Sequence, residues 1–146
     1  MHNNYVFQNY LESEVAAADP VQLVRMLYQG AIDAVAAART CIHGRDILGR
    51  SRQISKASLI LNELALNLDH SQGGEISRTL AELYDYMIQR LNQANFEQSD
   101  APLAEVLLLL TPLSEAWRQC RAESVPRVRP EYVSAGSEYQ PLSCMA

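Results

Sequence analysis

The sequence predicts an all-α protein: an antiparallel up-and-down four-helix bundle with an N-terminal arm and a disordered C-terminal tail. Apolar side chains recur with the 3.6-residue period of an α-helix in four segments of about 15 to 23 residues. Short polar links containing Gly, Asp or Pro separate these segments, so successive helices return alongside one another. A chain of 146 residues suits one domain with a sizeable core. We expect an arm over 1–18, a helical domain over 19–121 and a flexible tail over 122–146.

The predicted arm, residues 1–18, has large apolar side chains but no sustained helical stripe. These side chains include Phe7, Tyr10, Leu11 and Val15. Such a chain end is often only a frayed terminus. The number of large apolar groups is unusual for a frayed terminus and supports a docking role to the same degree, so both interpretations remain open.

The first helix is predicted to begin at Asp19-Pro20 and to end near Ile42. Asp19 can accept hydrogen bonds from free N–H groups of the first turn, and Pro20 occupies a position that needs no donor. Gly44 follows as a stop signal. One face carries the apolar residues Val24, Leu27, Ala31, Val35, Ala38 and Ile42.

A basic link over 43–51 then leads into the second helix, which is predicted to end near Leu68. We interpret the link as a solvated turn rather than an anion site. The core side carries Ile54, Ala57, Leu61, Leu64, Ala65 and Leu68. Leu59 and Leu66 project from nearly the other side of the helix. A helix with two apolar faces is either sandwiched inside the fold or offers its second face to a partner.

The third helix follows a polar break over 69–74, ends near Asn95 and has the widest apolar face in the chain. Its apolar arc spans roughly 140° on a helical wheel, so the helix must contact at least two neighbours. The arc comprises Ile76, Leu80, Leu83, Tyr84, Met87, Ile88, Leu91 and Ala94. Tyr86 and Arg90 fall at the rim of this arc.

The fourth helix is predicted to start after Ser99 or Asp100, with Pro102 in its first turn. Leu108 falls outside its apolar face, which carries Leu103, Val106, Leu107, Leu110, Leu113, Trp117 and Cys120. Pro112 removes a backbone hydrogen bond and is predicted to kink or break the helix, at a cost of about 3 kcal/mol. Beyond about Arg121 no periodicity remains, which predicts the disordered tail.

Composition and motifs argue against several classes of function. The net charge of −5 disfavours a nucleic-acid partner, and no segment is apolar enough for membrane insertion. A metalloenzyme of ferritin-like shape is disfavoured because the chain has no Glu-x-x-His motif, and its three histidines fall in the arm and in loops. No nucleophile motif or phosphate loop is present. We therefore expect a protein that is not an enzyme, has no cofactor and stays in the cytoplasm.

Three features are not needed to form the core of a helical bundle. They are the apolar arm, the leucines outside the core stripes (Leu59, Leu66 and Leu108), and the pair Tyr86 and Arg90 at the rim of the apolar arc. For each leucine alone, contacts inside the bundle are the favoured explanation. Together they predict a groove filled by a helical or extended peptide.

Several sequence strings resemble the flagellin export chaperone family, FliS. They are F-x-x-Y at Phe7 and Tyr10, ADPVQLVRMLYQGAI, ILNEL with a following LD, GGEI, LYDYMIQRLNQAN, and EAW at 115–117. They occur in the family's order from about Phe7 to Cys120. Pro112 is a departure from the pattern expected of the family's fourth helix.

The resemblance implies a cytosolic chaperone that binds the disordered C-terminal segment of flagellin, prevents its premature polymerisation and helps deliver it to a component of the flagellar type III export gate. Phe7 and Tyr10 match the family's arm motif; Tyr86, Arg90 and Asn95 match its third-helix motif. The partner-binding prediction comprises Phe7, Tyr10, Leu11, Val15, Leu59, Leu66, Tyr86, Arg90, Asn95 and Leu108. The alternative is a general helical-bundle adaptor for protein interactions. The sequence leaves open which flagellin is bound, and whether the free protein is monomeric or exchanges its arm in a homodimer.

Overall fold

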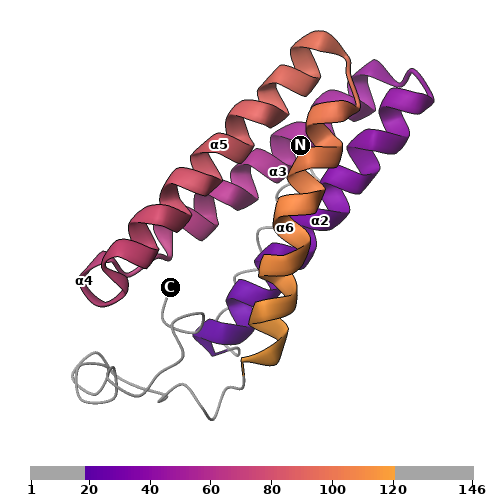
Figure 1. Ribbon diagram of the computed structural model, residues 1–146. Helices are drawn as coiled ribbons and strands as arrows, with labels where there is room; N and C mark the ends of the chain where they lie inside the picture. The colour runs from indigo at the N-terminus through magenta and orange to yellow at the C-terminus, as the bar shows by residue number, and fades with distance from the viewer. Residues whose placement is uncertain (1–18, 121–146) are drawn as a thin grey trace.

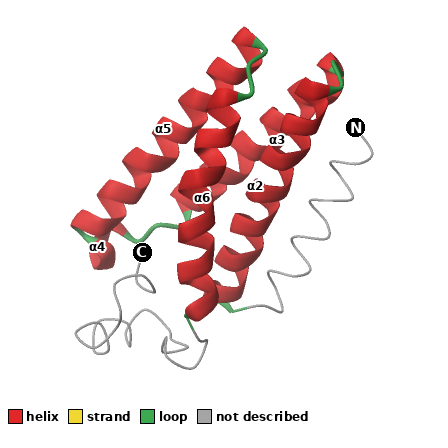
Figure 2. Ribbon diagram, turned by 45° about the vertical axis from the view of Figure 1, so that its right-hand side comes forward, coloured by secondary structure: helices red, strands yellow, loops and turns green. Residues whose placement is uncertain are grey.

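The computed structural model describes residues 19–120, and all the secondary structure within this range is helical (Figures 1 and 2). The four long helices are α2 (Pro20–His43), α3 (Ile47–Leu66), α5 (Glu75–Glu97) and α6 (Ala101–Gln119), with a one-turn helix α4 (His70–Gly73) before α5. The all-α bundle prediction is confirmed. The predicted arm and tail lie outside the described residues.

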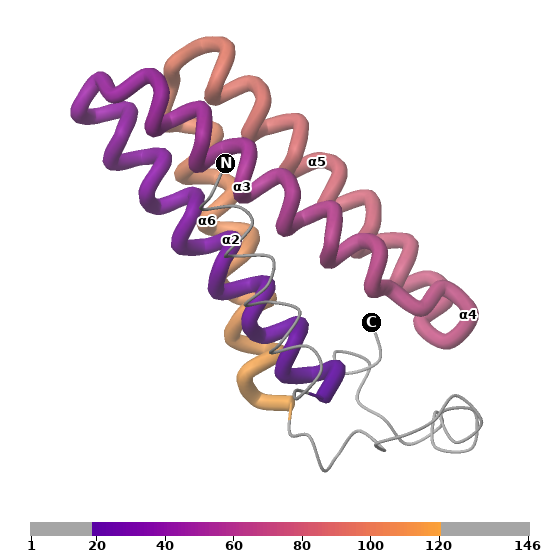
Figure 3. The backbone as a smooth tube through the Cα atoms, turned by 180° about the vertical axis from the view of Figure 1, so that it is seen from behind, coloured from indigo at the N-terminus to yellow at the C-terminus, as the bar shows by residue number. Residues whose placement is uncertain are grey.

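The long helices alternate in direction along the chain, as the tube in Figure 3 shows. Helix α2 packs against α3 and α6, and α5 packs against the same two helices. Helices α3 and α6 therefore occupy opposite corners of the bundle, as do α2 and α5. Helices α5 and α6 are close at their connecting link and diverge toward the end where α2 begins (Figures 1 and 2).

Small residues on α2 allow α3 to approach closely. Ala31, Ala34 and Ala38 are almost fully buried, and a Cβ added at Gly30 would lie 3.2 Å from Cδ1 of Ile60. Most residues of the four predicted core faces are buried or pack against the buried core. The core also buries Tyr28, Ile60 and Ser77, which the predicted faces did not include.

Helix α3 begins at Ile47, so the prediction of a link extending to Ser51 is wrong. The Asp46 carboxylate accepts a hydrogen bond from the Gly49 N–H at 2.9 Å and caps the first turn. This cap places Gly49 and Arg50 inside the helix, and the Arg50 side chain becomes buried.

Helix α6 continues without a break through Pro112. Pro112 and Leu108 are four residues apart and both are exposed, so the Leu108 carbonyl that loses its donor lies on the solvent side, where water can replace the missing N–H. Asp100 is at the N-cap position, yet its side chain makes no capping hydrogen bond. Its carboxylate instead accepts two hydrogen bonds from Arg39 of α2, at 2.7 and 2.9 Å.

Candidate functional site

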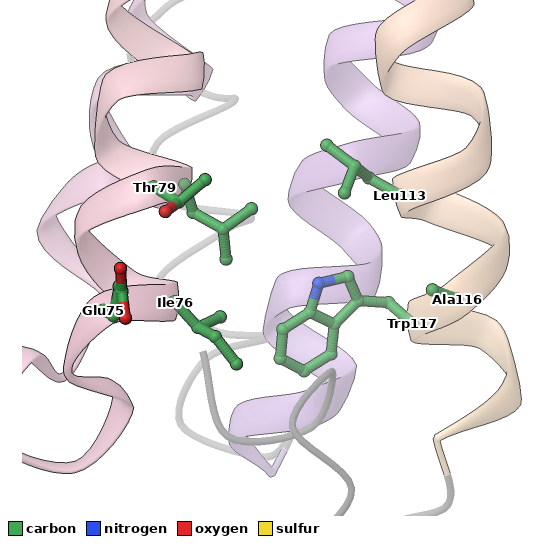
Figure 4. Close-up of a pocket in the computed structure, with 7 residues that line it drawn as sticks. Glu75, Ile76, Thr79, Leu113, Ala116 and Trp117 are labelled. Carbon is green, nitrogen blue, oxygen red and sulfur yellow. The ribbon is translucent and has the colours of Figure 1, made fainter.

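An apolar cleft opens where the first turns of α5 face the last turns of α6 (Figure 4). It has a volume of about 390 Å³ and is lined by Glu75, Ile76, Thr79, Leu80, Leu113, Ala116 and Trp117. In Figure 4 the side chains of Leu113 and Trp117 point from α6 toward Ile76 on α5. The divergence of the two helices therefore leaves apolar side chains without a facing layer at this end of the bundle.

Trp117 forms one wall of the cleft and is held from the opposite side by α2. The residue is 5% exposed, and its backbone carbonyl accepts a hydrogen bond from Nε of Arg25 at 2.9 Å. This link ties the last turn of α6 to the first turns of α2 and fixes the position of the wall.

Nearer the α5–α6 link, Tyr86, Arg90 and Glu105 form a polar cluster that joins the same two helices. The Tyr86 hydroxyl donates to Oε2 of Glu105 at 2.6 Å, and Nε of Arg90 donates to Oε1 at 2.5 Å. These two hydrogen bonds lower the pKa of Glu105, and the bond from Tyr86 has the larger effect. The same carboxylate raises the pKa of Tyr86, so this phenol remains a hydrogen-bond donor at neutral pH.

The cluster and the cleft lie along one continuous face. Along α5, steps of three or four residues lead from Thr79 through Leu83 to Tyr86 and Arg90; along α6, similar steps lead from Glu105 through Leu109 and Leu113 to Ala116. We name this surface the α5–α6 face. It is polar at one end and apolar at the other.

The leucines predicted to bind a partner are exposed but do not lie together. Leu108 is 75% exposed, one turn from Glu105 at the edge of the α5–α6 face. Leu59 and Leu66 are 64% and 78% exposed on α3, the helix at the corner opposite α6. The three leucines thus belong to two separate surfaces of the bundle.

Asn95 lies on the inner side of α5, away from this cluster. Its Oδ1 accepts a hydrogen bond from Nε of buried Arg50 at 2.9 Å, which links α5 to α3. This contact gives Asn95 a structural role, and its part in partner binding stays a prediction. Phe7, Tyr10, Leu11 and Val15 lie outside the described residues, so their predicted role is also untested.

Sequence reasoning missed parts of the site. Leu113 and Trp117 were expected only in the core, because a helical wheel contains no information about the divergence of two helices. Glu105 was not singled out, since the register between α5 and α6 decides which acid faces Tyr86 and Arg90. Exposed Ile47, Leu48 and Phe96 at the other end of the bundle were also missed; their apolar character near predicted helix ends was the available signal.

Among residues 19–120, no three His, Cys, Asp or Glu side chains gather where they could hold a metal ion. None of the helices formed by these residues is long and apolar enough to cross a membrane.

Comparison with known proteins gives a consistent family assignment. Residues 1–124 match the family model described as flagellar protein FliS. The flagellar secretion chaperone FliS of Salmonella typhimurium is 44% identical over 110 residues, which cover 75% of this chain and 82% of the relative. The flagellar secretion chaperone FliS of Campylobacter jejuni is 34% identical over 119 residues, 82% of this chain and 93% of the relative. A third relative, the flagellar secretion chaperone FliS of Escherichia coli, is 34% identical over 110 residues, 75% of this chain and 81% of the relative. The chain therefore belongs to the FliS family of flagellar proteins.

Proposed function

We propose that this protein is a cytoplasmic export chaperone that binds the disordered C-terminal segment of flagellin, prevents premature polymerisation and assists its delivery to the flagellar type III export gate. Family membership supports a role in flagellar secretion. The observation that carries the proposal is the α5–α6 face, where an apolar cleft continues into the Tyr86–Arg90–Glu105 cluster.

The cleft supplies the apolar part of the binding energy. Each large apolar side chain of the client that becomes fully buried contributes roughly 1.5–3 kcal/mol. The client loses conformational entropy when it becomes ordered, and this cost offsets much of the gain. Binding that depends on a few buried side chains would therefore remain reversible, as handover to an export apparatus requires.

Titration of a flagellin C-terminal peptide into the full chain, followed by calorimetry, tests the proposal. Ala116→Arg would place a long cationic side chain at the wall of the cleft and should weaken binding at least tenfold. Ala36→Arg is the matched control, because it makes the same change at an exposed alanine of α2 that does not line the cleft. No binding at tens of micromolar peptide would overturn the proposal. Equal affinity for unrelated apolar peptides would favour the general adaptor instead.

The salt dependence of the same titration tests the apolar character of binding. A net charge of −5 does not steer an acidic client toward the protein. We therefore expect the affinity for the flagellin peptide to change little between low and high salt. A steep loss of affinity with salt would show that ion pairs dominate and would contradict this mechanism.

Leu59 and Leu66 offer a second contact for a client that wraps around the bundle. They are exposed on α3, apart from the α5–α6 face. The double substitution Leu59→Ser and Leu66→Ser should weaken peptide binding with little change in thermal stability. Leu48→Ser is the control, since Leu48 is also exposed on α3 but was not predicted to bind. Unchanged affinity in the double variant would remove these leucines from the site.

The proposal also includes the arm motif at Phe7 and Tyr10, which lies outside the described residues. In the free protein we expect these side chains to cover client surface outside the α5–α6 cleft, where Leu59 and Leu66 are exposed. Deleting residues 1–11 should then alter peptide affinity while the melting temperature of the bundle stays nearly constant. A collapse of the melting temperature would instead make the arm part of the core.

A further inference from the structure

We propose that the cleft between α5 and α6 is a docking site for the chain's own C-terminal segment, residues 125–146, when no other partner occupies it. Other candidates are weaker. Ile47, Leu48 and Phe96 are exposed at the far end of the bundle, but nothing indicates what would cover them. The Tyr86–Arg90–Glu105 cluster belongs to the site already described.

The position of the cleft relative to the end of α6 is the first argument. The described chain ends at Cys120, three residues after Trp117, and the last two turns of α6 supply Leu113, Ala116 and Trp117 to the lining. An extended chain advances about 3.3 Å per residue, so a few residues after Cys120 suffice to turn back into the cleft. Helix α2 begins at the same end of the bundle but supplies none of the lining residues, whereas the segment after α6 follows directly on the helix that supplies three of them.

The chemistry of the segment complements that of the cleft. Apolar Ile76, Leu80, Leu113 and Trp117 line the cleft, and Glu75 places an exposed carboxylate at its rim. The segment contains Arg127 and Arg129, followed by Tyr132, Val133, Tyr139 and Leu142. A guanidinium group can pair with Glu75 while aromatic and aliphatic side chains enter the cleft. The lack of helical periodicity in this segment suits docking as an extended chain.

The segment lies outside the family match. The family model matches residues 1–124 and leaves 125–146 outside the match. The features that this chain shares with the family model therefore do not account for the segment.

A segment tethered to α6 has a large advantage over a free peptide, because a short flexible linker gives an effective concentration in the millimolar range. Weak intrinsic affinity is enough to keep the cleft covered, and a tighter client can still displace the segment.

Photo-crosslinking in the full chain tests this proposal without any client. Thr79 lines the cleft and is exposed, so p-benzoylphenylalanine replaces it without disturbing the core. After irradiation, mass spectrometry should find crosslinks within one chain to residues 125–146. The same amino acid at exposed Ala36 is the control and should give none. Replacing Tyr132, Tyr139 and Leu142 together by Ser should lower the crosslink yield at least fivefold.

Three outcomes would overturn the proposal. They are crosslinks to residues 1–18 in place of 125–146, crosslinks between two chains, and no specific crosslink to 125–146 at Thr79. Because no flagellin peptide is present, these outcomes leave the proposed chaperone function to be judged by its own titration.

Discussion

The hydroxyl oxygens of Tyr28 and Tyr84 lie 2.5 Å apart and share a hydrogen bond in the centre of the bundle. Tyr28 belongs to α2 and Tyr84 to α5, so this bond joins two helices at opposite corners. Both side chains are almost fully buried. Burial raises the pKa of both phenols above the ordinary value of 10.0, so both stay protonated.

Replacing Tyr84 by Phe should lower the free energy of unfolding by about 1–3 kcal/mol, because the Tyr28 hydroxyl loses this buried partner. In the double variant Tyr28→Phe and Tyr84→Phe, the loss should be smaller than the sum of the single losses. Urea denaturation measures all three. Tyr86→Phe is the comparison, since it removes an exposed hydroxyl hydrogen bond, to Glu105, from the same helix and should cost less than the buried pair. Additive losses would show that the two hydroxyls do not depend on each other.

The fold could be predicted from the sequence because each helix buries one stripe of apolar residues, and a stripe is a local pattern. The start of α3 could not, since Gly49 and the neighbouring basic residues suggested a link, whereas the Asp46 cap depends on backbone geometry. Within the site, Tyr86 and Arg90 stood out because they fitted neither the apolar nor the polar side of their helix. Their partner Glu105 and the cleft depend on the register and divergence of α5 and α6, which no single helix specifies.

The hydrogen bond between Arg50 and Asn95 predicts a stability role for a residue that the sequence placed in the binding site. Asn95→Ala removes the acceptor of a buried guanidinium N–H and should lower the free energy of unfolding by about 1–3 kcal/mol. Chemical denaturation measures this change, and the peptide titration measures affinity in parallel. The exposed neighbour Asn92→Ala serves as the control. Unchanged stability with weakened peptide binding would return Asn95 to the client site.

The ion pair between Arg39 and Asp100 predicts a loss of stability in acid. The hydrogen bond from Arg39 holds the pKa of Asp100 below its ordinary value of 3.8. A carboxyl group whose folded-state pKa is lowered stabilises the fold above its ordinary pKa, and this contribution disappears as the pH falls through the folded-state value.

Asp100→Asn should therefore lower the free energy of unfolding by about 1 kcal/mol at pH 7. The value is modest because the side chains of Arg39 and Asp100 are both partly exposed. The difference between the two proteins should shrink as the pH falls below the ordinary pKa of Asp100. Urea denaturation at a series of pH values measures this difference. A constant difference between pH 7 and pH 3 would contradict the assignment to Asp100.

Pro112 occupies an exposed position inside an otherwise continuous helix, which makes it a site for stabilisation. Pro112→Ala supplies the missing N–H for the Leu108 carbonyl and removes the ring, and an alanine in a helix interior is favoured over proline by about 3 kcal/mol. The unfolded chain gains freedom when proline is removed, which returns up to about 1 kcal/mol. We expect a net gain of about 2 kcal/mol in the free energy of unfolding. Thr111→Ala at the exposed neighbouring position should change it by no more than about 0.5 kcal/mol.

The same variant also probes how α6 presents the cleft, since Leu113 and Ala116 follow Pro112 within about one turn. If proline orients this part of α6, Pro112→Ala should change the affinity for the flagellin peptide as well as the stability. A gain in stability with unchanged affinity would show that the cleft geometry comes from helix packing alone. A loss of stability would contradict the expected gain and show that the surrounding structure depends on the proline ring.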